Sequence, residues 1–293
     1  MRLPATSANL GPCFDAAAIA LTLHLDIRAT RGEEFSLHAS GRAPEICGQL
    51  RNNLLIETYC NTLTAEGRNP VPLALQVDNG IPLGMGCGSS AAVRLAGVAL
   101  AAHFGQLGWD GERILGEACA LEGHPDNAAA CWLGGFVSAT CEEKRVYAAK
   151  LPPPPQWAAL LLLPHQPLAT TSARAVLPDN YSREDVVANL QRATLLATAF
   201  ATGRGELLHI AMQDRIHQPY REEICPLLPL LTPLAGDAGI LGVALSGAGP
   251  AVLLLVEKSA IAAAKALVSE VTQTIAGLEL LSCQLEPSGI AYL

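Results

Sequence analysis

Four consecutive prolines, Pro152 to Pro155, interrupt the sequence near its middle. Each proline fixes its own φ angle and lacks an amide donor, so neither a helix nor a central strand continues through the run. A chain of 293 residues allows one large or two medium domains, and half of its residues are apolar. We therefore expect the prolines to separate an N-terminal domain, residues 1–151, from a C-terminal domain, residues 156–293.

The N-terminal half alternates between strand and helix patterns. Strands are expected over residues 19–30, 35–39, 73–78, 136–140 and 145–151, the last two as a hairpin. Helices are expected over residues 53–66, 89–104 and 111–122. Asp110 is a suitable N-terminal cap for the third helix, and Gly105 is expected to end the second helix in the left-handed conformation.

The C-terminal half has a clearer order. After a strand over residues 157–163, Ser182 and Asp185 form the pattern of a helix capping box. The elements that follow are a short helix over 206–213, strands over 240–245 and 251–257, a helix over 259–275, and a strand near 278–285. The order βα-ββ-αβ is that of a ferredoxin-like domain. The sequence therefore predicts an α+β protein of two domains rather than one doubly wound sheet.

Charge and cysteine content limit the possible partners. The 19 basic and 27 acidic residues give a net charge of −8, which argues against nucleic-acid or anionic-membrane binding. The nine cysteines include no C-x-x-C pair and no cluster with zinc-ligand spacing. They are expected to be reduced and buried, as in a cytosolic protein.

Two apolar stretches could be mistaken for targeting or membrane segments. Pro4 and Asn9 interrupt any apolar leader, so no signal peptide is expected. Nineteen uncharged residues lie between Asp237 and Glu257, but a glycine turn at Gly247 breaks them into two expected strands. A cytoplasmic protein without a membrane span is therefore predicted.

The strongest local signal for a ligand is the run from Pro82 to Ala92, P-L-G-M-G-C-G-S-S-A-A. Three glycines at alternate positions let the backbone approach a ligand closely, and the helix that follows adds its positive N-terminal end. Ser89 and Ser90 offer hydroxyls to a phosphate oxygen or to Mg²⁺. The run lacks the lysine of a Walker A loop, and a tight strand-to-helix turn with Ser89 as N-cap is the alternative interpretation.

A second signal is the run from Glu122 to Asn127, E-G-H-P-D-N. Glu122 lies at the C-terminal end of an expected helix, where the helix dipole disfavours an anion and a bound divalent cation would compensate it. A solvated glutamate would also tolerate this position. Asp126 and Asn127 follow a turn fixed by proline and are expected to point toward one place, although turns are generally rich in both residue types. His124 is expected to be a structural hydrogen-bonding residue.

Three further features lie in the C-terminal half. The run S-G-A-G-P, from Ser246 to Pro250, has more glycine than a hairpin turn needs, as close approach to a ligand would explain. Arg174, near the start of a short expected helix, and Arg221, at the end of Q-P-Y-R, could each bind a carboxylate through two hydrogen bonds. Either arginine could equally be an ordinary surface residue.

Together these runs resemble the GHMP kinase superfamily and, within it, the homoserine kinases. The first shared motif is P-A-T-S-A-N-L-G-P-C-F-D, from Pro4 to Asp15. The runs at 82–92 and 122–127 are similar to the family's ATP loop and acidic motif, and those at 171–174, 213–221 and 246–250 to later motifs in the same order. The resemblance spans nearly the whole chain, and its first and acidic motifs are close to specific for homoserine kinases.

The resemblance implies the two-domain GHMP kinase fold, with an N-terminal domain like the second domain of ribosomal protein S5 and a ferredoxin-like C-terminal domain. It also implies ATP and Mg²⁺ as cofactors. The nucleotide would contact Asn53 and the loop residues Pro82, Leu83, Gly84, Met85, Gly86, Cys87, Gly88, Ser89, Ser90, Ala91 and Ala92. The metal ion would be held by Ser89, Ser90 and Glu122.

The same resemblance implies an amino-acid substrate, L-homoserine, and its phosphorylation in threonine biosynthesis. The substrate would lie among Asn9, Asp15, Arg174, Arg221, Gly247 and Gly249. Asp15 suits the ammonium group and the two arginines suit the carboxylate. Asp126 and Asn127 are implied as catalytic residues at the attacking hydroxyl, and whether Asp126 takes the hydroxyl proton is open. Homodimers are common in the family.

Two rival interpretations and one departure accompany the resemblance. Another GHMP kinase, acting on mevalonate, a sugar or threonine, would keep the ATP loop but would not need two arginines beside Asp15. A non-catalytic ATP- or metabolite-binding regulator on this fold would be favoured by the loss of Glu122 or Asp126, and both are present. The family usually has glycine where Cys13 stands, so the loop around Cys13 is expected to be slightly repositioned.

Overall fold

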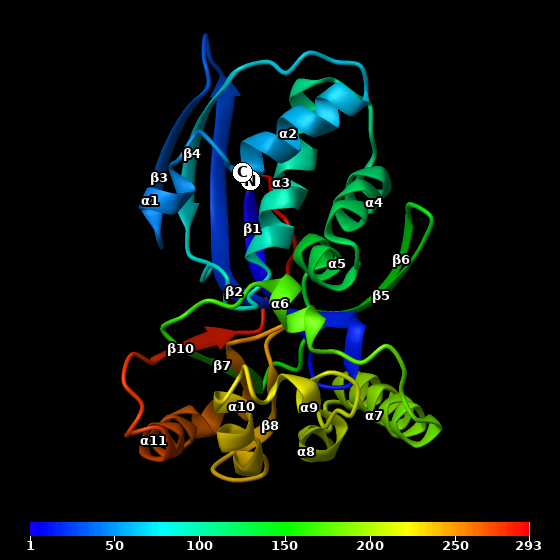
Figure 1. Ribbon diagram of the computed structural model, residues 1–293, viewed down its shortest axis with the longest axis vertical. Coiled ribbons are helices and arrows are strands. Elements are labelled where there is room, and N and C mark those ends of the chain that lie inside the picture. Colours follow the sequence, from blue (N-terminus) through cyan, green and yellow to red (C-terminus); the bar gives the residue numbers. More distant parts are fainter. Residues whose placement is uncertain (293) are drawn as a thin grey trace.

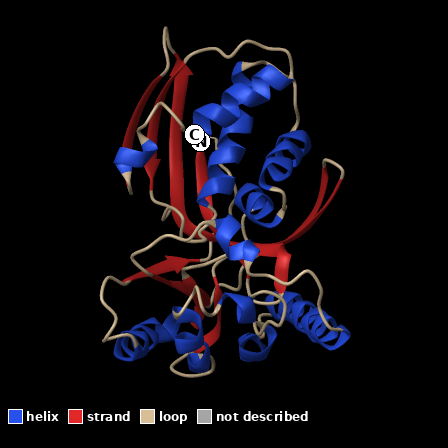
Figure 2. Ribbon diagram, in the orientation of Figure 1, coloured by secondary structure: helices blue, strands red, loops and turns tan. Residues whose placement is uncertain are grey.

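A computed structural model describes residues 1–292 and contains two β-sheets, one in each half of the chain. Figure 1 shows the N-terminal half above and the C-terminal half below, and Figure 2 separates strands from helices by colour. The first sheet ends with a strand at Leu151 and the second begins at Trp157, so the four prolines lie between the sheets. The expected α+β class is confirmed, whereas the domain limits at 151 and 156 stay a prediction.

The N-terminal sheet has the strand order β3-β4-β2-β5-β6, with β1 paired to β2. Its strands are β1 (Arg2–Asn9), β2 (Cys13–Arg31), β3 (Ser36–Gly41), β4 (Leu73–Asn79), β5 (Phe136–Glu142) and β6 (Arg145–Leu151). The expected hairpin of β5 and β6 is confirmed. β2 begins well before residue 19 because its first part pairs antiparallel with β1. Half of the residues of β1 are polar and do not alternate regularly with the apolar ones, yet most of this strand is buried.

Helices cover one face of this sheet. They are α2 (Leu54–Ala65), α3 (Ser89–Phe104), α4 (Gly111–Glu122) and α5 (Asp126–Leu133), with the short α1 (Pro44–Cys47) beside β3. α5 contacts β1, β2 and β5, α3 packs against α5 and β1, and α2 and α4 pack against α3 (Figure 1). Asp110 caps α4 by accepting a hydrogen bond from the Arg113 amide, as predicted.

The predicted conformation at the end of α3 is wrong. Gly105 has a right-handed conformation, with φ −79°, and the left-handed residue after α3 is Gln106. Glycine at 105 leaves room for the neighbouring side chain of Leu63, because a Cβ atom there would lie 2.2 Å from Leu63 Cδ2. Asp126 and Asn127 follow the turn at residues 123–125, as predicted, and they open helix α5, whose N-cap residue is Pro125.

The C-terminal sheet has four antiparallel strands in the order β10-β7-β9-β8. They are β7 (Trp157–Leu163), β8 (Ile240–Leu245), β9 (Val252–Glu257) and β10 (Glu279–Gln284). Numbered within this half, the order is 4-1-3-2, which confirms the ferredoxin-like arrangement. The uncharged stretch after Asp237 forms β8 and β9, and no helix in the described part of the chain has the length and apolarity to cross a membrane.

Helices and short 3₁₀ turns surround the C-terminal sheet. The helices are α6 (Thr170–Ala175), α7 (Arg183–Thr202), α8 (Leu208–Ala211), α9 (Gln218–Arg221), α10 (Leu227–Leu231) and α11 (Ile261–Val271). The 3₁₀ turns are Gly205–Leu207, Thr232–Leu234 and Lys258–Ala260. Ser182 caps α7 by accepting from the Asp185 amide, which confirms the capping pattern. The helices expected over 206–213 and 259–275 are shorter than predicted, because each begins with a 3₁₀ turn and ends before the predicted last residue.

The two halves are joined by more than the proline segment. Phe200 of α7 stacks on Phe136 of β5 and meets Trp157 of β7 edge-on. The last residues return to the first sheet, where Arg2 and Ala291 exchange backbone hydrogen bonds of 2.8 and 2.9 Å. Both termini therefore lie together beside β1 (Figure 1). All nine cysteines are free thiols, as predicted, but Cys47, Cys60 and Cys141 are only partly buried.

Candidate active site

A cavity of about 440 Å³ lies where the two halves meet. Most of the predicted site residues line it: Asn9, Asp15, Pro82, Gly84, Gly86, Cys87, Gly88, Ser89, Ser90, Ala91, Glu122, Asp126, Asn127, Arg174, Arg221 and Gly247. These residues come from β1, the start of β2, the loop before α3, the first turn of α3, the end of α4, the start of α5, α6, α9 and the β8–β9 turn. The chain thus brings together motifs that are separated by more than two hundred residues in sequence.

Five predicted residues do not line this cavity: Asn53, Leu83, Met85, Ala92 and Gly249. Leu83 and Met85 line a neighbouring cavity of about 390 Å³, which shares Pro82 with the first. Asn53 caps α2, accepting from two amides of that helix, and its side-chain amide donates to the carbonyls of Cys47 and Gln49. Its side chain therefore holds the segment after α1 rather than lining either cavity.

The glycine-rich loop is held in a left-handed conformation at each of its three alternate glycines. Gly84, Gly86 and Gly88 have φ angles of 67°, 76° and 71°. A Cβ atom on Gly86 would lie 2.0 Å from the Ser246 carbonyl oxygen, and one on Gly88 would lie 1.9 Å from Thr6 Oγ1. The Ser246 hydroxyl also donates to the Gly86 carbonyl over 2.8 Å. The glycines therefore serve loop-to-loop packing as well as leaving the backbone open to a ligand.

Gly86→Ala should lower the free energy of unfolding by about 3 kcal/mol or more, because backbone strain and a clash with main chain combine. Gly67→Ala is the matched control, since Gly67 has a φ angle of 68° but nothing within 4 Å of its would-be Cβ. That control should cost only ~1–2 kcal/mol of strain. Urea unfolding of both variants measures the difference, and equal losses would show that the packing of Gly86 is unimportant.

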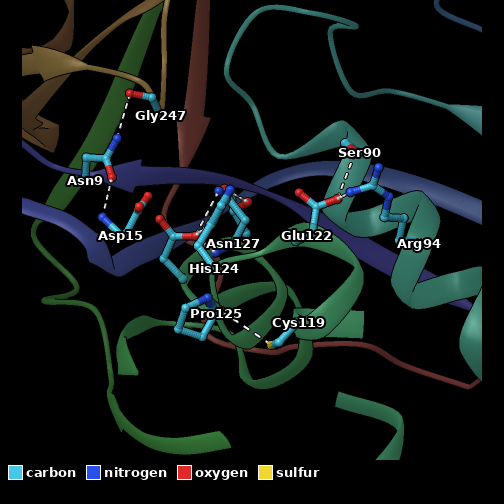
Figure 3. Close-up of polar contacts among 12 residues, drawn as sticks. Asn9, Asp15, Ser90, Arg94, Cys119, Glu122, His124, Pro125, Asn127 and Gly247 are labelled. Atoms are coloured by element: carbon cyan, nitrogen blue, oxygen red, sulfur yellow. Dashed lines mark hydrogen bonds and ion pairs between the residues drawn. The ribbon is translucent and has the colours of Figure 1, made fainter. Parts of the chain in front are cut away.

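Asn9 links the first motif to the β8–β9 turn. Its side-chain amide donates to the Gly247 carbonyl over 2.8 Å, and its Oδ1 accepts from the Asp15 amide over 3.0 Å (Figure 3). Gly247 in turn donates its own amide to the Ala8 carbonyl. Asn9 itself has a φ angle of 71°, a conformation that asparagine adopts more readily than most residues. Both ends of its amide are thus occupied by contacts that fix the shape of the cavity wall.

Asp15 and Arg174 form a two-hydrogen-bond ion pair at the cavity, with N–O distances of 2.6 and 3.0 Å. The hydrogen bonds that Arg174 donates to Asp15 raise the pKa of Arg174 above its usual value. Arg174 lies in the last turn of α6, not near its start as expected, so its side chain points from the end of the helix toward β2. The two groups that were expected to recognise opposite ends of a substrate are paired with each other.

Arg221 is buried, with 1% of its surface exposed, so the interpretation as an ordinary surface residue is wrong for it. Its Nε donates to the Ala173 carbonyl and its Nη1 to His217 Nδ1, both over 2.9 Å. The guanidinium also lies 5.5 Å from the centre of the Phe14 ring. Burial, with the nearby positive charge of Arg174, lowers the pKa of Arg221.

His217 belongs to the site although sequence reasoning missed it. Its Nδ1 accepts from Arg221 and its Nε2 donates to the Gly11 carbonyl over 2.8 Å, which fixes the neutral tautomer. Burial lowers the pKa of His217 to about 4, in keeping with a neutral ring. The four-residue spacing from Arg221 on a helix was the available signal. His217 thereby connects the guanidinium to the first motif.

The acidic motif forms a compact hydrogen-bonded cluster. Asp126 is 1% exposed, and its Oδ1 accepts from His124 Nδ1 over 2.5 Å and from the Asn127 amide over 2.6 Å. Thr6 donates its hydroxyl to Asn127 Oδ1 over 2.7 Å. Burial lowers the pKa of His124, but the hydrogen bond and charge of Asp126 outweigh it and raise that pKa above its usual value.

Two carboxylates and one imidazole of this region converge on the same point. Ligand atoms of Asp15, His124 and Asp126 lie within 4.8 Å of one another. Because Asp126 is buried and both carboxylates accept hydrogen bonds there, this corner of the cavity is suited to a cation such as an ammonium group.

Glu122 has two hydrogen-bond partners, Ser90, which was a predicted site residue, and Arg94, which was not. The Ser90 hydroxyl donates to Glu122 Oε1 over 2.8 Å, and Arg94 Nη1 donates to the same oxygen over 2.7 Å (Figure 3). Carboxylate and hydroxyl oxygens are ligands that Mg²⁺ prefers, so this donor set fits the expected metal ion. Arg94 was missed, and its four-residue spacing from Ser90 on α3 was the available signal.

Comparison with known proteins identifies the family. The model of the GHMP kinases N terminal domain matches residues 53–135, and that of the GHMP kinases C terminal domain matches residues 196–272. A homoserine kinase of Solibacter usitatus is 44% identical over 88% of this chain and 85% of its own length. A homoserine kinase of Deinococcus radiodurans is 38% identical over 86% and 82% of the two chains.

A solved structure agrees with the sequence comparison. The crystal structure of homoserine kinase from Cytophaga hutchinsonii superposes with a TM-score of 0.81, covering 98% of this chain and 95% of that one at 25% identity. The two proteins therefore share their fold over nearly the whole chain, including the part that holds the cavity between the halves. The chain belongs to the GHMP kinases and, within them, to the homoserine kinase family.

Proposed function

We propose that the cavity binds ATP with Mg²⁺ and L-homoserine, and transfers the terminal phosphoryl group to the side-chain hydroxyl of homoserine. One observation carries this conclusion. A single cavity has a glycine loop at a helix N-terminus on one side and two arginines with two carboxylates on the other. The first side suits a polyphosphate, and the second suits a zwitterionic amino acid.

The nucleotide phosphates are placed on residues 84–91. Left-handed glycines turn the backbone of this loop, and α3 begins at Ser89, so its unpaired amides and positive end face the ligand. The neighbouring cavity supplies an apolar surface for the base from residues that include Ile46, Leu83 and Met85. Asn53 then acts indirectly, because it holds the segment that follows Ile46.

Ser90 and Glu122 are the residues best placed to hold Mg²⁺, with Ser89 beside them on the cavity wall. When bound, the ion neutralises charge on the phosphate oxygens during transfer. The proposal assigns the remaining work to positioning by protein groups. Phosphoryl transfer depends mainly on such positioning, because its transition state is loose.

Homoserine is placed between Asp15 and the two arginines. Its carboxylate would take the place of Asp15 as the anionic partner of Arg174, with Arg221 behind it. Its ammonium group would replace the lost cation near Asp15, where His124 and Asp126 also converge. The zwitterion therefore exchanges one half-buried ion pair for two, and an analogue lacking either charge leaves one group unpaired.

Asp126 is assigned to orient the attacking hydroxyl. Its Oδ1 is occupied by His124 and Asn127, which leaves Oδ2 as the carboxylate oxygen available to a substrate. In the transfer step a bond forms between the homoserine oxygen and the terminal phosphorus, and the bond from that phosphorus to the ADP oxygen breaks. The hydroxyl proton passes to a phosphate oxygen in this scheme.

The proposal also covers the cellular location and the oligomeric state of the enzyme. Nine free thiols fit a reducing compartment, and we place the enzyme in the cytoplasm. A homodimer stays a prediction from the family resemblance.

Homoserine should exceed mevalonate, galactose and threonine in kcat/KM by about a hundredfold or more, since each of these leaves a buried charge unpaired or misplaces the hydroxyl. A coupled assay of ADP release with Mg²⁺ measures the comparison. 4-Hydroxybutyrate, which keeps the carboxylate but lacks the ammonium group, tests the Asp15 corner separately. A higher kcat/KM for mevalonate or galactose would refute the assignment.

A further inference from the structure

Arg94 has no role in the scheme above, although its side chain lines the same cavity as the glycine loop. It lies one helical turn after Ser90 on α3, so the two side chains share a face of that helix. Its Nη1 donates to the Leu121 carbonyl and to Glu122 Oε1, each over 2.7 Å. With 29% of its side chain exposed, the guanidinium is at the cavity wall and not locked in the core.

This pairing explains how Glu122 is tolerated where it stands. Glu122 ends α4, and the negative end of the helix dipole disfavours its carboxylate. The Leu121 carbonyl belongs to the last turn of the same helix, whose carbonyls lack partners within the helix. Arg94 donates a hydrogen bond to both the Leu121 carbonyl and the Glu122 carboxylate. The Glu122 side chain is only 9% exposed, so solvent screens its ion pair with Arg94 less than it would screen a surface pair.

The same pairing places Arg94 in competition with a metal ion. Glu122 Oε1 accepts from both Ser90 and Arg94, and this oxygen and hydroxyl are the pair that would hold the ion. A divalent cation beside Glu122 and the Arg94 guanidinium would repel each other at this distance. Nucleotide phosphates on the loop before α3 would offer the guanidinium a second anionic partner, because Arg94 lines that cavity too.

We propose that Arg94 exchanges partners, pairing with Glu122 in the nucleotide-free enzyme and with phosphate oxygens once ATP and the metal ion bind. Arg94 thereby positions the metal-binding carboxylate and is a further phosphate-binding residue. The exchange makes the two ligands depend on each other: the metal alone binds weakly because Arg94 holds Glu122, and the nucleotide draws Arg94 away. This inference rests on the metal role given to Glu122 under the proposed function.

Arg94→Gln separates the two halves of the exchange without any turnover. Binding of Mn²⁺ to the nucleotide-free protein, followed by electron paramagnetic resonance of the free ion, should become about tenfold tighter, because the competing cation is gone. Binding of a non-hydrolysable ATP analogue in the presence of EDTA, followed by calorimetry, should become about tenfold weaker. Opposite signs in the two titrations are the expected result.

Arg113→Gln is the matched control, since it removes one positive charge from an exposed arginine that pairs with Glu66 on another helix. It should leave both titrations within about twofold of wild type. Arg94→Lys keeps the charge, so it should stay much closer to wild type than Arg94→Gln. If circular dichroism shows that Arg94→Gln is unfolded, Arg94→Lys is used in both titrations in its place. A lysine variant that changes both affinities as much as glutamine contradicts a charge exchange.

Glu122→Gln distinguishes failure of this inference from failure of its premise. If Glu122→Gln leaves Mn²⁺ affinity unchanged, Glu122 is not the metal-binding residue and the exchange falls with it. If Glu122→Gln abolishes Mn²⁺ binding while Arg94→Gln matches wild type in both titrations, the metal role stands and the exchange is wrong. The substrate comparison with homoserine is independent of either outcome.

Discussion

Replacing Arg221 with alanine is expected to raise the KM for homoserine by about two to three orders of magnitude, while ATP affinity changes by less than about threefold. Arg221 is buried beside the Phe14 ring, and it lines the part of the cavity assigned to the carboxylate. Removing one partner of a buried charge pair costs about 2–5 kcal/mol. The glycine loop lies on the other side of the cavity, so nucleotide binding should be preserved.

Arg221→Lys should recover little of this loss. The Arg221 fork is fixed by two contacts, one to the Ala173 carbonyl and one to His217 Nδ1. A lysine ammonium is a point charge and cannot keep both contacts while presenting a further donor to a carboxylate. Steady-state kinetics with each substrate varied in turn measure the change.

Stability must be measured beside the kinetics, because alanine at 221 leaves the Ala173 carbonyl and His217 Nδ1 without their partner. An unpaired buried acceptor costs ~1–3 kcal/mol, so a lower melting temperature is expected for Arg221→Ala. Arg113→Ala provides a surface arginine as control, and Arg174→Ala tests the second carboxylate ligand in parallel. A folded Arg221→Ala enzyme with an unchanged KM for homoserine would exclude Arg221 from the carboxylate site.

Helix-capping residues, prolines and apolar runs predicted much of the fold. The four prolines and the caps Asp110 and Ser182 are local signals, and local signals are read directly from the chain. Apolar runs such as β7 and β8 were also predicted with their observed limits. The errors occurred where tertiary packing, and not the local sequence, determines burial and conformation. Half of the residues of β1 are polar although the strand is largely buried, and Gly105 packs closely against the Leu63 side chain without adopting the left-handed conformation.

The residues of the site were largely predicted, but their pairing was not. Motifs identify which side chains carry useful chemistry, and sixteen of the predicted residues line one cavity. Which of them contact each other depends on distances across the fold. The ion pair of Asp15 with Arg174 spans 159 positions, and His217 reaches Gly11 across 206. Arg94 lies outside the motifs, and its contact with Glu122 across the fold shows that it belongs to the site.

Asp126→Asn should reduce kcat by about tenfold or less if Asp126 only orients the hydroxyl, because an asparagine oxygen still accepts a hydrogen bond. If Asp126 is a general base, the loss should reach ~10²–10⁴-fold. The structure favours orientation, since Asp126 is fixed through Oδ1 by His124 and Asn127 and has one carboxylate oxygen left for the substrate. Single-turnover rates at saturating substrates measure the difference.

The pH dependence separates the two roles further through His124. Asp126 raises the pKa of His124 above its ordinary value of about 6.5, so the imidazole is cationic below that raised pKa. A cationic ring at the corner assigned to the ammonium group should repel homoserine, and kcat/KM should fall as the pH drops through this pKa. In Asp126→Asn the pKa of His124 loses its main raising cause while burial still lowers it. The fall in kcat/KM should therefore move to lower pH.

His124→Gln is the control, because a side chain that does not titrate should remove this part of the profile while leaving Asp126 in place. If Asp126 only orients the hydroxyl, Asp126→Asn shifts the low-pH fall of kcat/KM to lower pH and keeps most of kcat. Under general-base catalysis, the acid side of kcat itself disappears with the carboxylate. An Asp126→Asn enzyme that is folded, binds both substrates and has no measurable turnover would contradict orientation, and the hydroxyl proton would then have to pass to Asp126 Oδ2.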